Sequence, residues 1–169
     1  TQASGLIMLV SIVGLALVHF GDTSVWTFNY NELLGTQMSS TVGFMLMLGF
    51  FIAFAVKMPL VPFHGWMADT QEQSPTAGSV DISGIMLKTA AYGLLRFTLP
   101  LFPEASIEFT PIAMTLGVIS IFYGAWLAFK QTDIKRLAAY SSLSHMGFVT
   151  VAIYASSVLA YQGAVIQMI

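Results

Sequence analysis

The sequence predicts an all-α polytopic membrane protein with about five complete transmembrane helices and part of a sixth. Of its 169 residues, 56% are hydrophobic and only 8% are charged, whereas about a quarter of an ordinary soluble domain is charged. The apolar residues also form runs of about twenty, the length that crosses a bilayer as a helix. A soluble fold could not bury this much apolar surface, so we expect residues 1–169 to form a single membrane domain in lipid.

The first span is expected at residues 3–20, which are nearly all apolar. Residues 21–40 turn polar and contain Trp26 and Tyr30, aromatic residues typical of the membrane–water interface. This segment is expected to be a loop with at most a short amphipathic turn.

The second span, residues 42–67, is expected to be a helix broken near Pro59. Lys57, Pro59 and Pro62 lie inside this apolar stretch. Pro59 lacks an N–H group and pushes the preceding residue out of the helical region. Backbone groups freed at that depth are tolerated against protein or water but not against lipid.

The starts of the remaining spans are predicted from helix N-cap residues and first-turn prolines. Ser74 and Pro75 read as an N-cap and a first-turn proline, and Thr110 with Pro111 repeats the pattern. Polar loops are expected at residues 69–74, 100–110 and 130–136, and spans at 75–99, 111–129, 134–154 and 158–169, the last one incomplete. Because the chain starts without Met and stops inside an apolar run, we expect an internal piece of a longer protein.

The basic residues predict the topology. Loop 130–136 contains Lys and Arg, whereas the loops that alternation places on the opposite side (residues 21–40, 100–110 and 155–157) contain neither. The positive-inside rule therefore predicts that loop 130–136 faces the cytoplasm.

Lys57 is the first candidate for a functional ionisable residue. Burying a charged lysine in the membrane costs about 2.5–3.5 kcal/mol even on a mild insertion scale. The alternative is a lysine near a helix end that snorkels to the headgroups, but the sequence is apolar on both sides. The break would also leave helix C-terminal carbonyls beside the ammonium, a favourable place for a cation.

Lys88 lies about a dozen residues into the third span, or roughly 18 Å along a helix, close to the bilayer centre. A buried lysine can have a lowered pKa and carry protons. Asp81 precedes Lys88 by seven residues, on the same face of an α-helix. It is either a partner of Lys88 or a first-turn acid that complements the helix dipole.

His145 lies near the middle of the fifth span. A neutral imidazole can relay a proton because one ring nitrogen donates while the other accepts; alternatively, the histidine only joins two helices by a hydrogen bond. His64 follows the break and is a weaker candidate. Hydroxyl side chains that could hold water near His145 are Tyr140, Ser141, Ser142 and Ser144.

Other chemistry is not indicated. The chain has no cysteine, so it has no thiolate metal site and no cysteine ligation of an iron–sulfur cluster. Its net charge of −2 gives no general attraction for nucleic acid. It also lacks a phosphate-cradling glycine loop, a zinc spacing and a nucleophile elbow.

Two motifs carry a family resemblance. KMPLVPFHGWMADTQEQSPTAGSVDISGIMLKTAAYGLLRF at residues 57–97 and TDIKRLAAYSSLSHMGF at 132–148 closely resemble the antiporter-like, proton-conducting membrane subunits of respiratory complex I and of multi-subunit sodium/proton antiporters. FNYNELLGTQMSS and YQGAVIQMI are more similar to the bacterial complex I subunits.

The resemblance implies a fold of two inverted repeats, each with one broken helix. It identifies Lys57 with the lysine on the broken helix, Lys88 with a connecting lysine and His145 with a histidine of the central polar axis. The family's acidic partner of the first lysine lies on an earlier helix, and its second broken helix follows later, so we expect this stretch alone not to form a complete channel.

The resemblance also implies a function and partners. We expect a proton-translocating subunit in the bacterial inner membrane, in contact with lipid and with other membrane-arm subunits, including homologous antiporter-like ones. No cofactor is expected in this chain, because NADH, FMN, iron–sulfur clusters and quinone would be bound by other subunits. The alternatives are a subunit of a sodium/proton antiporter and a structural membrane subunit that transports nothing.

Overall fold

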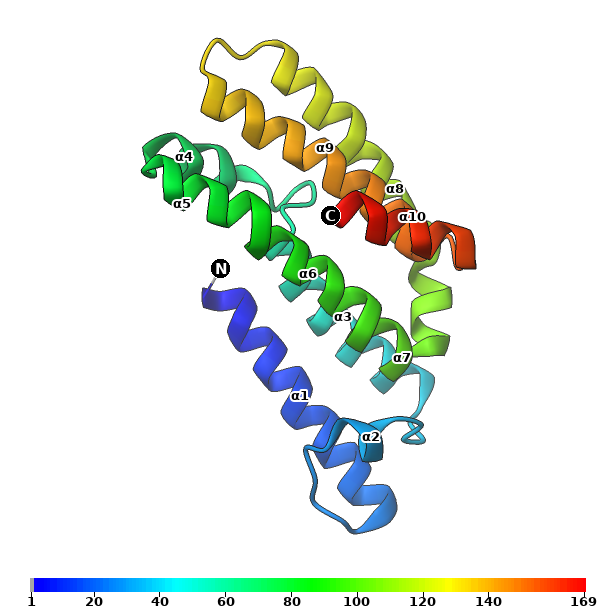
Figure 1. Cartoon of the computed structure of the whole chain (residues 1–169). Coiled ribbons are helices and arrows are strands. Elements are labelled where there is room, and N and C mark those ends of the chain that lie inside the picture. The colour runs from blue at the N-terminus through cyan, green and yellow to red at the C-terminus, as the bar shows by residue number, and fades with distance from the viewer. Residues whose placement is uncertain (1) are drawn as a thin grey trace. The chain divides into compact units, whose positions relative to one another are not determined.

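The computed structural model describes residues 2–169, and in that range it contains helices and connecting segments but no strand (Figure 1). The predicted all-α class is therefore confirmed. In chain order the helices are α1 (Gln2–Thr23), α2 (Tyr30–Leu33), α3 (Ser40–Lys57), α4 (Gly65–Gln73), α5 (Thr76–Asp81), α6 (Leu87–Gly93), α7 (Leu99–Leu101), α8 (Pro103–Phe129), α9 (Ile134–Tyr154) and α10 (Val158–Met168).

Three of the described helices are long and apolar enough to cross a membrane, namely α1, α3 and α8. Helix α9 has 21 residues but carries a polar run from Tyr140 to His145, which makes it less apolar. The individual bilayer crossings of the other helices stay predictions.

The predicted break in the second span is present. Helix α3 ends at Lys57, the next seven residues are not α-helical, and α4 begins at Gly65. Two prolines in this interval, Pro59 and Pro62, explain why the helix does not continue, because neither supplies a backbone N–H group.

The prediction of a polar loop at residues 69–74 was wrong. Residues 69–73 complete helix α4, and only Ser74 and Pro75 separate it from α5. Residues 69–73 contain no Gly or Pro, so nothing in this run stops a helix whose polar face is exposed.

The loop expected at residues 100–110 is also absent. Pro100 occupies the first turn of α7, only Phe102 leaves helical geometry (φ −132°, ψ 61°), and α8 begins at Pro103. A proline within a helix leaves the carbonyl four residues earlier without its N–H donor, and here the Tyr30 hydroxyl donates to that carbonyl, of Arg96, at 3.0 Å. Pro111, expected to start the span, instead lies inside α8, and Glu104 and Glu108 are helical.

Two π-helical segments interrupt the third span. The segments η1 (Ile82–Met86) and η2 (Leu94–Thr98) flank α6, so the helical stretch from α5 to α7 changes its hydrogen-bonding pattern twice. The sequence analysis did not predict them. Such segments are rare and occur often at functional sites.

The described chain divides into two compact units. The first contains the residues up to Phe54 together with Gly93–Phe109. Here α1 and α3 approach closely, because a side chain at Gly49 would collide with Ser11, and Phe50 packs against Phe102 at a ring-centroid distance of 5.5 Å.

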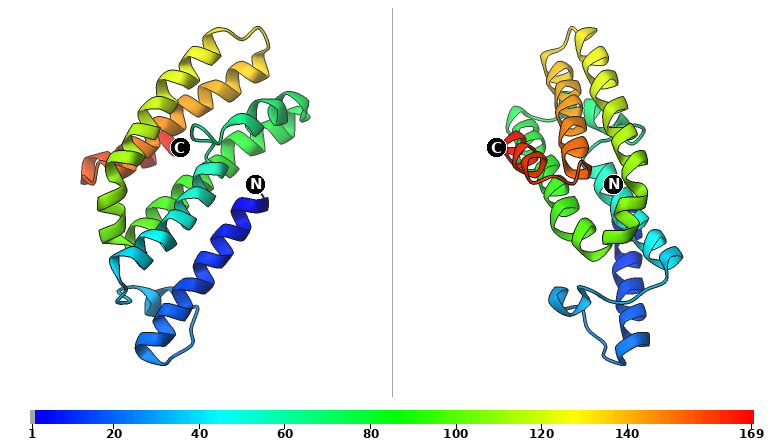
Figure 2. Two further views of the ribbon diagram at one scale, coloured as in Figure 1. Left: turned by 180° about the vertical axis from the view of Figure 1, so that it is seen from behind. Right: turned by 90° about the vertical axis from the view of Figure 1, so that its right-hand side faces the viewer.

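The second unit contains Ala55–Tyr92 and Thr110–Ile169. In it, α9 lies beside α8, α4 and α10 (Figures 1 and 2). A Cβ atom on Gly147 of α9 would lie 2.7 Å from the carbonyl oxygen of Gly117 in α8. Glycine therefore lets the two backbones touch, as in other membrane helix pairs.

Candidate functional site

The helix break is held by a shifted set of hydrogen bonds. In an unbroken helix, Pro59 would have to serve the carbonyl of Ala55 but has no N–H group. The N–H of Leu60 binds that carbonyl instead, at 3.0 Å. As a result, the next carbonyl along the helix loses its own partner.

Two side chains replace hydrogen-bond partners that the backbone loses at the break. The indole Nε1 of Trp66 donates to the carbonyl of Val56 at 2.8 Å. The N–H of Val61 would bind the Lys57 carbonyl in a continuous helix but donates to Ser120 Oγ of α8 at 3.0 Å. These bonds satisfy the carbonyls of Ala55 and Val56 and the N–H of Val61, as a membrane interior requires.

Lys57 is the last residue of α3 and is half-buried at the edge of this break. Its ammonium group is therefore carried by the C-terminus of α3, where the backbone carbonyls form the negative end of the helix dipole. Within residues 2–169, the ion pairs are made by Arg136, and no carboxylate lies within 4.0 Å of Lys57.

Lys88 lies in α6, two residues after η1, and is half-buried. Its Nζ is 3.5 Å from the carbonyl oxygen of Ile169, the outer limit of a hydrogen bond. Asp81 is exposed and is the sixth residue of α5 rather than a first-turn acid. Because η1 lies between Asp81 and Lys88, seven residues no longer correspond to two α-helical turns, and the described part of the chain contains no ion pair between them.

His145 is exposed on α9, and its Nδ1 lies 3.0 Å from Nε2 of Gln167 on α10. When the amide donates, Nδ1 accepts, and the neutral imidazole carries its proton on Nε2. Sequence reasoning missed Gln167, because only the packing of α10 on α9 brings it to the histidine.

Two of the four hydroxyl residues predicted to hold water near His145 have defined hydrogen-bond partners. Ser144 Oγ donates to the carbonyl of Ile121 at 3.1 Å, and Ser142 Oγ donates to the carbonyl of Ala138 at 2.9 Å. Both hydroxyl oxygens keep a lone pair that can accept from water. Tyr140 and Ser141 are half-buried on the same helix.

His64 ends the broken segment, immediately before α4. Its ring meets the ring of Tyr123 edge to face, with centroids 5.1 Å apart. This contact links the break to α8 at a second point within the same unit.

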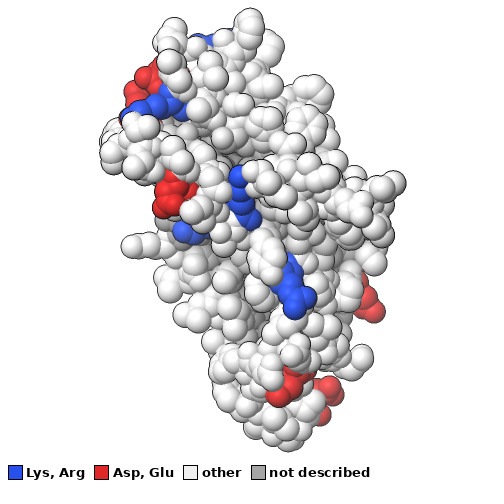
Figure 3. Space-filling model, viewed as in Figure 1, with Lys and Arg blue, Asp and Glu red and all other residues white. Residues whose placement is uncertain are grey.

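The two basic residues at the start of α9 bind α4. Arg136 pairs with Asp69 at 2.8 Å and with Glu72 at 2.6 Å. Lys135 Nζ donates to the carbonyl of Ser74 at 2.8 Å, just beyond the end of α4. In Figure 3, basic and acidic side chains adjoin near the start of α9.

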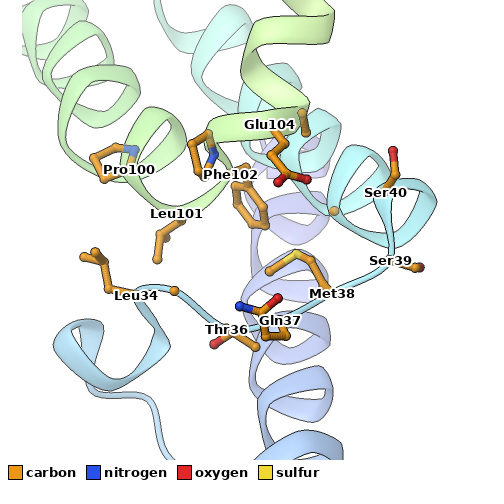
Figure 4. A pocket seen from close by; sticks show the side chains of 14 residues that line it. Leu34, Thr36, Gln37, Met38, Ser39, Ser40, Pro100, Leu101, Phe102 and Glu104 are labelled. Carbon is orange, nitrogen blue, oxygen red and sulfur yellow. The ribbon is translucent and has the colours of Figure 1, made fainter.

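A cavity of about 310 Å³ lies in the first unit, apart from every predicted relay residue. It lies between the segment before α3 and the α7–α8 turn, and Figure 4 places Met38, Phe102 and Glu104 along it. Glu104 is its only carboxylate and is exposed. The cavity therefore adds no group to the candidate relay.

No group of three or more His, Cys, Asp or Glu residues in the described range could hold a metal ion. The described part of the second unit therefore offers lysine, histidine, hydroxyl, amide and carboxylate side chains rather than a metal-binding cluster. These groups bind and release protons or hold water.

Comparisons with known proteins show the family of this chain. The family described as NADH:quinone oxidoreductase/Mrp antiporter, transmembrane, matches residues 1–169. The chain is 73% identical over 169 residues to NADH-quinone oxidoreductase subunit M of Escherichia coli K12, covering 100% of this chain and 33% of that protein. It is 67% identical to subunit M of Pseudomonas aeruginosa, with the same coverage.

A solved structure of respiratory complex I from Thermus thermophilus with bound NADH is similar to 96% of this chain and to 34% of the matched chain, with a TM-score of 0.85 and 30% sequence identity. The chain thus spans about a third of the length of the curated relatives that it matches.

Proposed function

Because this chain belongs to the transmembrane family of NADH:quinone oxidoreductase and Mrp antiporter subunits, we propose that it is part of a proton-translocating membrane-arm subunit of bacterial NADH:quinone oxidoreductase. The resemblance inferred from the two motifs is confirmed by the match over residues 1–169. The observation that carries the proposal is Lys57, a lysine at the edge of a helix break in an apolar chain.

The proposed mechanism is a proton relay through titratable side chains. Lys57 binds or releases a proton when its acidic partner, on a helix outside residues 1–169, moves or changes charge. Lys88 and His145 then pass the proton along a water-filled polar axis. The three residues belong to the same compact unit, which supports a common path.

The same proposal assigns the redox steps elsewhere. NADH, FMN, iron–sulfur clusters and quinone are bound by other subunits, and this chain contributes the coupling of quinone reduction to proton movement. Its partners are the other membrane-arm subunits, including homologous antiporter-like ones, and the surrounding lipid. The subunit lies in the inner membrane with loop 130–136 in the cytoplasm.

A second candidate function is cation/proton antiport, because the matched family includes Mrp antiporter subunits. The relatives compared above favour the first function, since both are NADH-quinone oxidoreductase subunits. NADH-driven proton pumping that persists in sodium-free vesicles is expected for the first function, and a strict sodium requirement for the second.

The decisive test changes Lys57 in the full-length subunit. In inverted membrane vesicles, Lys57→Ala is expected to abolish proton pumping and to slow NADH oxidation, by roughly tenfold or more, because the relay loses its protonatable group. Lys57→Arg keeps a cation and is expected to retain part of both activities.

The control is Lys130→Ala, which removes an exposed lysine outside the relay, and native gels establish that each complex assembles. Normal pumping by both Lys57 variants would contradict the proposal and favour a structural subunit that transports nothing.

A further inference from the structure

The break in the second span is bonded to one hydroxyl group of another helix. Ser120 of α8 is fully buried, with 0% exposure. Its Oγ donates to the carbonyl of Leu116 at 2.8 Å and accepts the N–H of Val61 at 3.0 Å. The Ser120 hydroxyl therefore donates its single proton within its own helix, and one of its lone pairs accepts the N–H at the break.

The acceptor is needed because this N–H has lost its helical partner. Val61 is half-buried, and lipid offers no partner that replaces the lost hydrogen bond. Without Ser120 Oγ, the N–H has two outcomes. It stays unsatisfied at a desolvation cost, or it returns to the carbonyl of Lys57 and tightens the turn.

Both outcomes act on Lys57. The residue ends α3, and the Val61 N–H is the donor that a continuous helix would place on its carbonyl. By binding this donor, Ser120 ties the chain after Lys57 to α8, next to the two prolines that end the helix.

We propose that Ser120 is a positioning residue of the relay, whose buried hydroxyl anchors the helix break to α8 and so fixes the place of Lys57. The inference rests on the proposed function of Lys57. Ser120 itself carries no proton to or from Lys57, and its effect is transmitted through the main chain of residues 57–61.

The sequence offers a matched control on the same helix. Thr115 Oγ1 donates to the carbonyl of Pro111 at 2.7 Å, the same bond to the fourth preceding residue that Ser120 makes. Thr115 is exposed, and its hydroxyl does not reach the break. Thr115→Ala therefore removes an α8 hydroxyl without touching Val61.

The test uses the assembled complex that contains the full-length subunit. Hydrogen–deuterium exchange of a peptide covering residues 55–66 is measured by mass spectrometry, together with proton pumping per NADH oxidised. In Ser120→Ala, exchange at the break is expected to rise roughly tenfold and pumping to fall roughly two- to tenfold.

Two further variants isolate the hydroxyl group. Ser120→Thr keeps it and is expected to retain slow exchange and pumping, and Thr115→Ala is expected to match the unmodified complex. If Ser120→Ala does not assemble, Ser120→Cys, which has a similar size but a weaker acceptor, takes its place with the same expected changes.

Unchanged exchange in the Ser120 variants would overturn the proposed hydrogen bond. Faster exchange with unchanged pumping, in a complex where Lys57→Ala abolishes pumping, would overturn the positioning role and leave the proposed function intact. Normal pumping in Lys57→Ala would identify the relay itself as wrong, and the positioning role would fall with it.

Discussion

Among single residues, His145 has the partner that best defines its chemistry. Its Nδ1 lies 3.0 Å from the amide nitrogen of Gln167, which fixes the direction of the ring and leaves Nε2 for exchange with water or a neighbouring group. A relay histidine has to accept and donate protons in turn. An amide is a suitable partner because it offers both a donor and an acceptor after a half rotation.

Replacing Gln167 by leucine is expected to lower proton pumping roughly two- to tenfold, because the imidazole loses the bond that orients it. His145→Ala is expected to lower pumping further. Both are measured in vesicles at matched amounts of assembled complex.

Gln162→Leu is the control, because Gln162 is exposed on the same helix and its side chain forms no hydrogen bond in the described part of the chain. Equal losses in the two glutamine variants would indicate that α10 tolerates no leucine, and would count against an orienting role.

The ionisable candidates could be predicted from the sequence because a charge inside an apolar run is costly and therefore conspicuous. Lys57 and Lys88 needed no tertiary information. Gln167 and Ser120 could not be found in this way, since their roles come from contacts with residues 22 and 59 positions away. An isolated glutamine or serine in a span has no distinctive pattern of its own.

Among the elements, α8 and α9 approach each other closely at their glycines. A Cβ atom on Gly124 would lie 2.8 Å from the backbone nitrogen of Ser144, and one on Gly147 would lie 2.9 Å from that of Ile121. Backbone atoms cannot move aside as a flexible side chain can. These glycines therefore set the distance between α8, whose Ser120 binds the break, and α9, which carries His145.

Gly147→Ala is expected to destabilise the assembled subunit by about 1–3 kcal/mol, because the added methyl group overlaps the backbone of α8. The change is measured as thermal stability of the purified complex in detergent. Gly163→Ala is the matched control, since a Cβ atom there has no atom within 4 Å. If the two variants are equally stable, the close packing of α8 on α9 is not as described.

The helices could be predicted where their limits are set by strong local signals. The span expected at 134–154 is α9, whose start is capped by the side chain of Asp133. The predictions failed where polarity was taken to mean a loop, as in residues 69–74, or where proline was taken to mean an end, as in residues 100–110. In both places the local chemistry permits a helix, and in the first, packing against the basic start of α9 supports it.

For the molecule as a whole, the distribution of basic residues predicts its orientation. Residues 130–136, of which the last three begin α9 rather than forming a loop as predicted, contain three of the six Lys and Arg residues. Arg136 is bound to carboxylates of α4, while Lys130 is exposed beside the ring of Trp126. Lys130 is thus a surface residue that can be replaced without loss of an ion pair.

Single cysteines can test the orientation, because residues 1–169 contain none. In a cysteine-free full-length subunit, Lys130→Cys is expected to react with a membrane-impermeant maleimide in inverted vesicles and to stay unlabelled in right-side-out ones, because positive loops remain in the cytoplasm. Asp22→Cys, in the opposite polar segment, is expected to give the reverse pattern. Labelling of both positions from the same side would contradict the predicted topology.

Between residues 82 and 98, the segments η1 and η2 change the angular position of successive residues around the helix axis. A π-helical turn closes its hydrogen bond one residue later than an α-helical turn. Residues on the two sides of each segment therefore differ in angular phase from a continuous α-helix. A helical wheel drawn at 3.6 residues per turn through this stretch therefore assigns residues beyond each segment, Lys88 among them, to the wrong face.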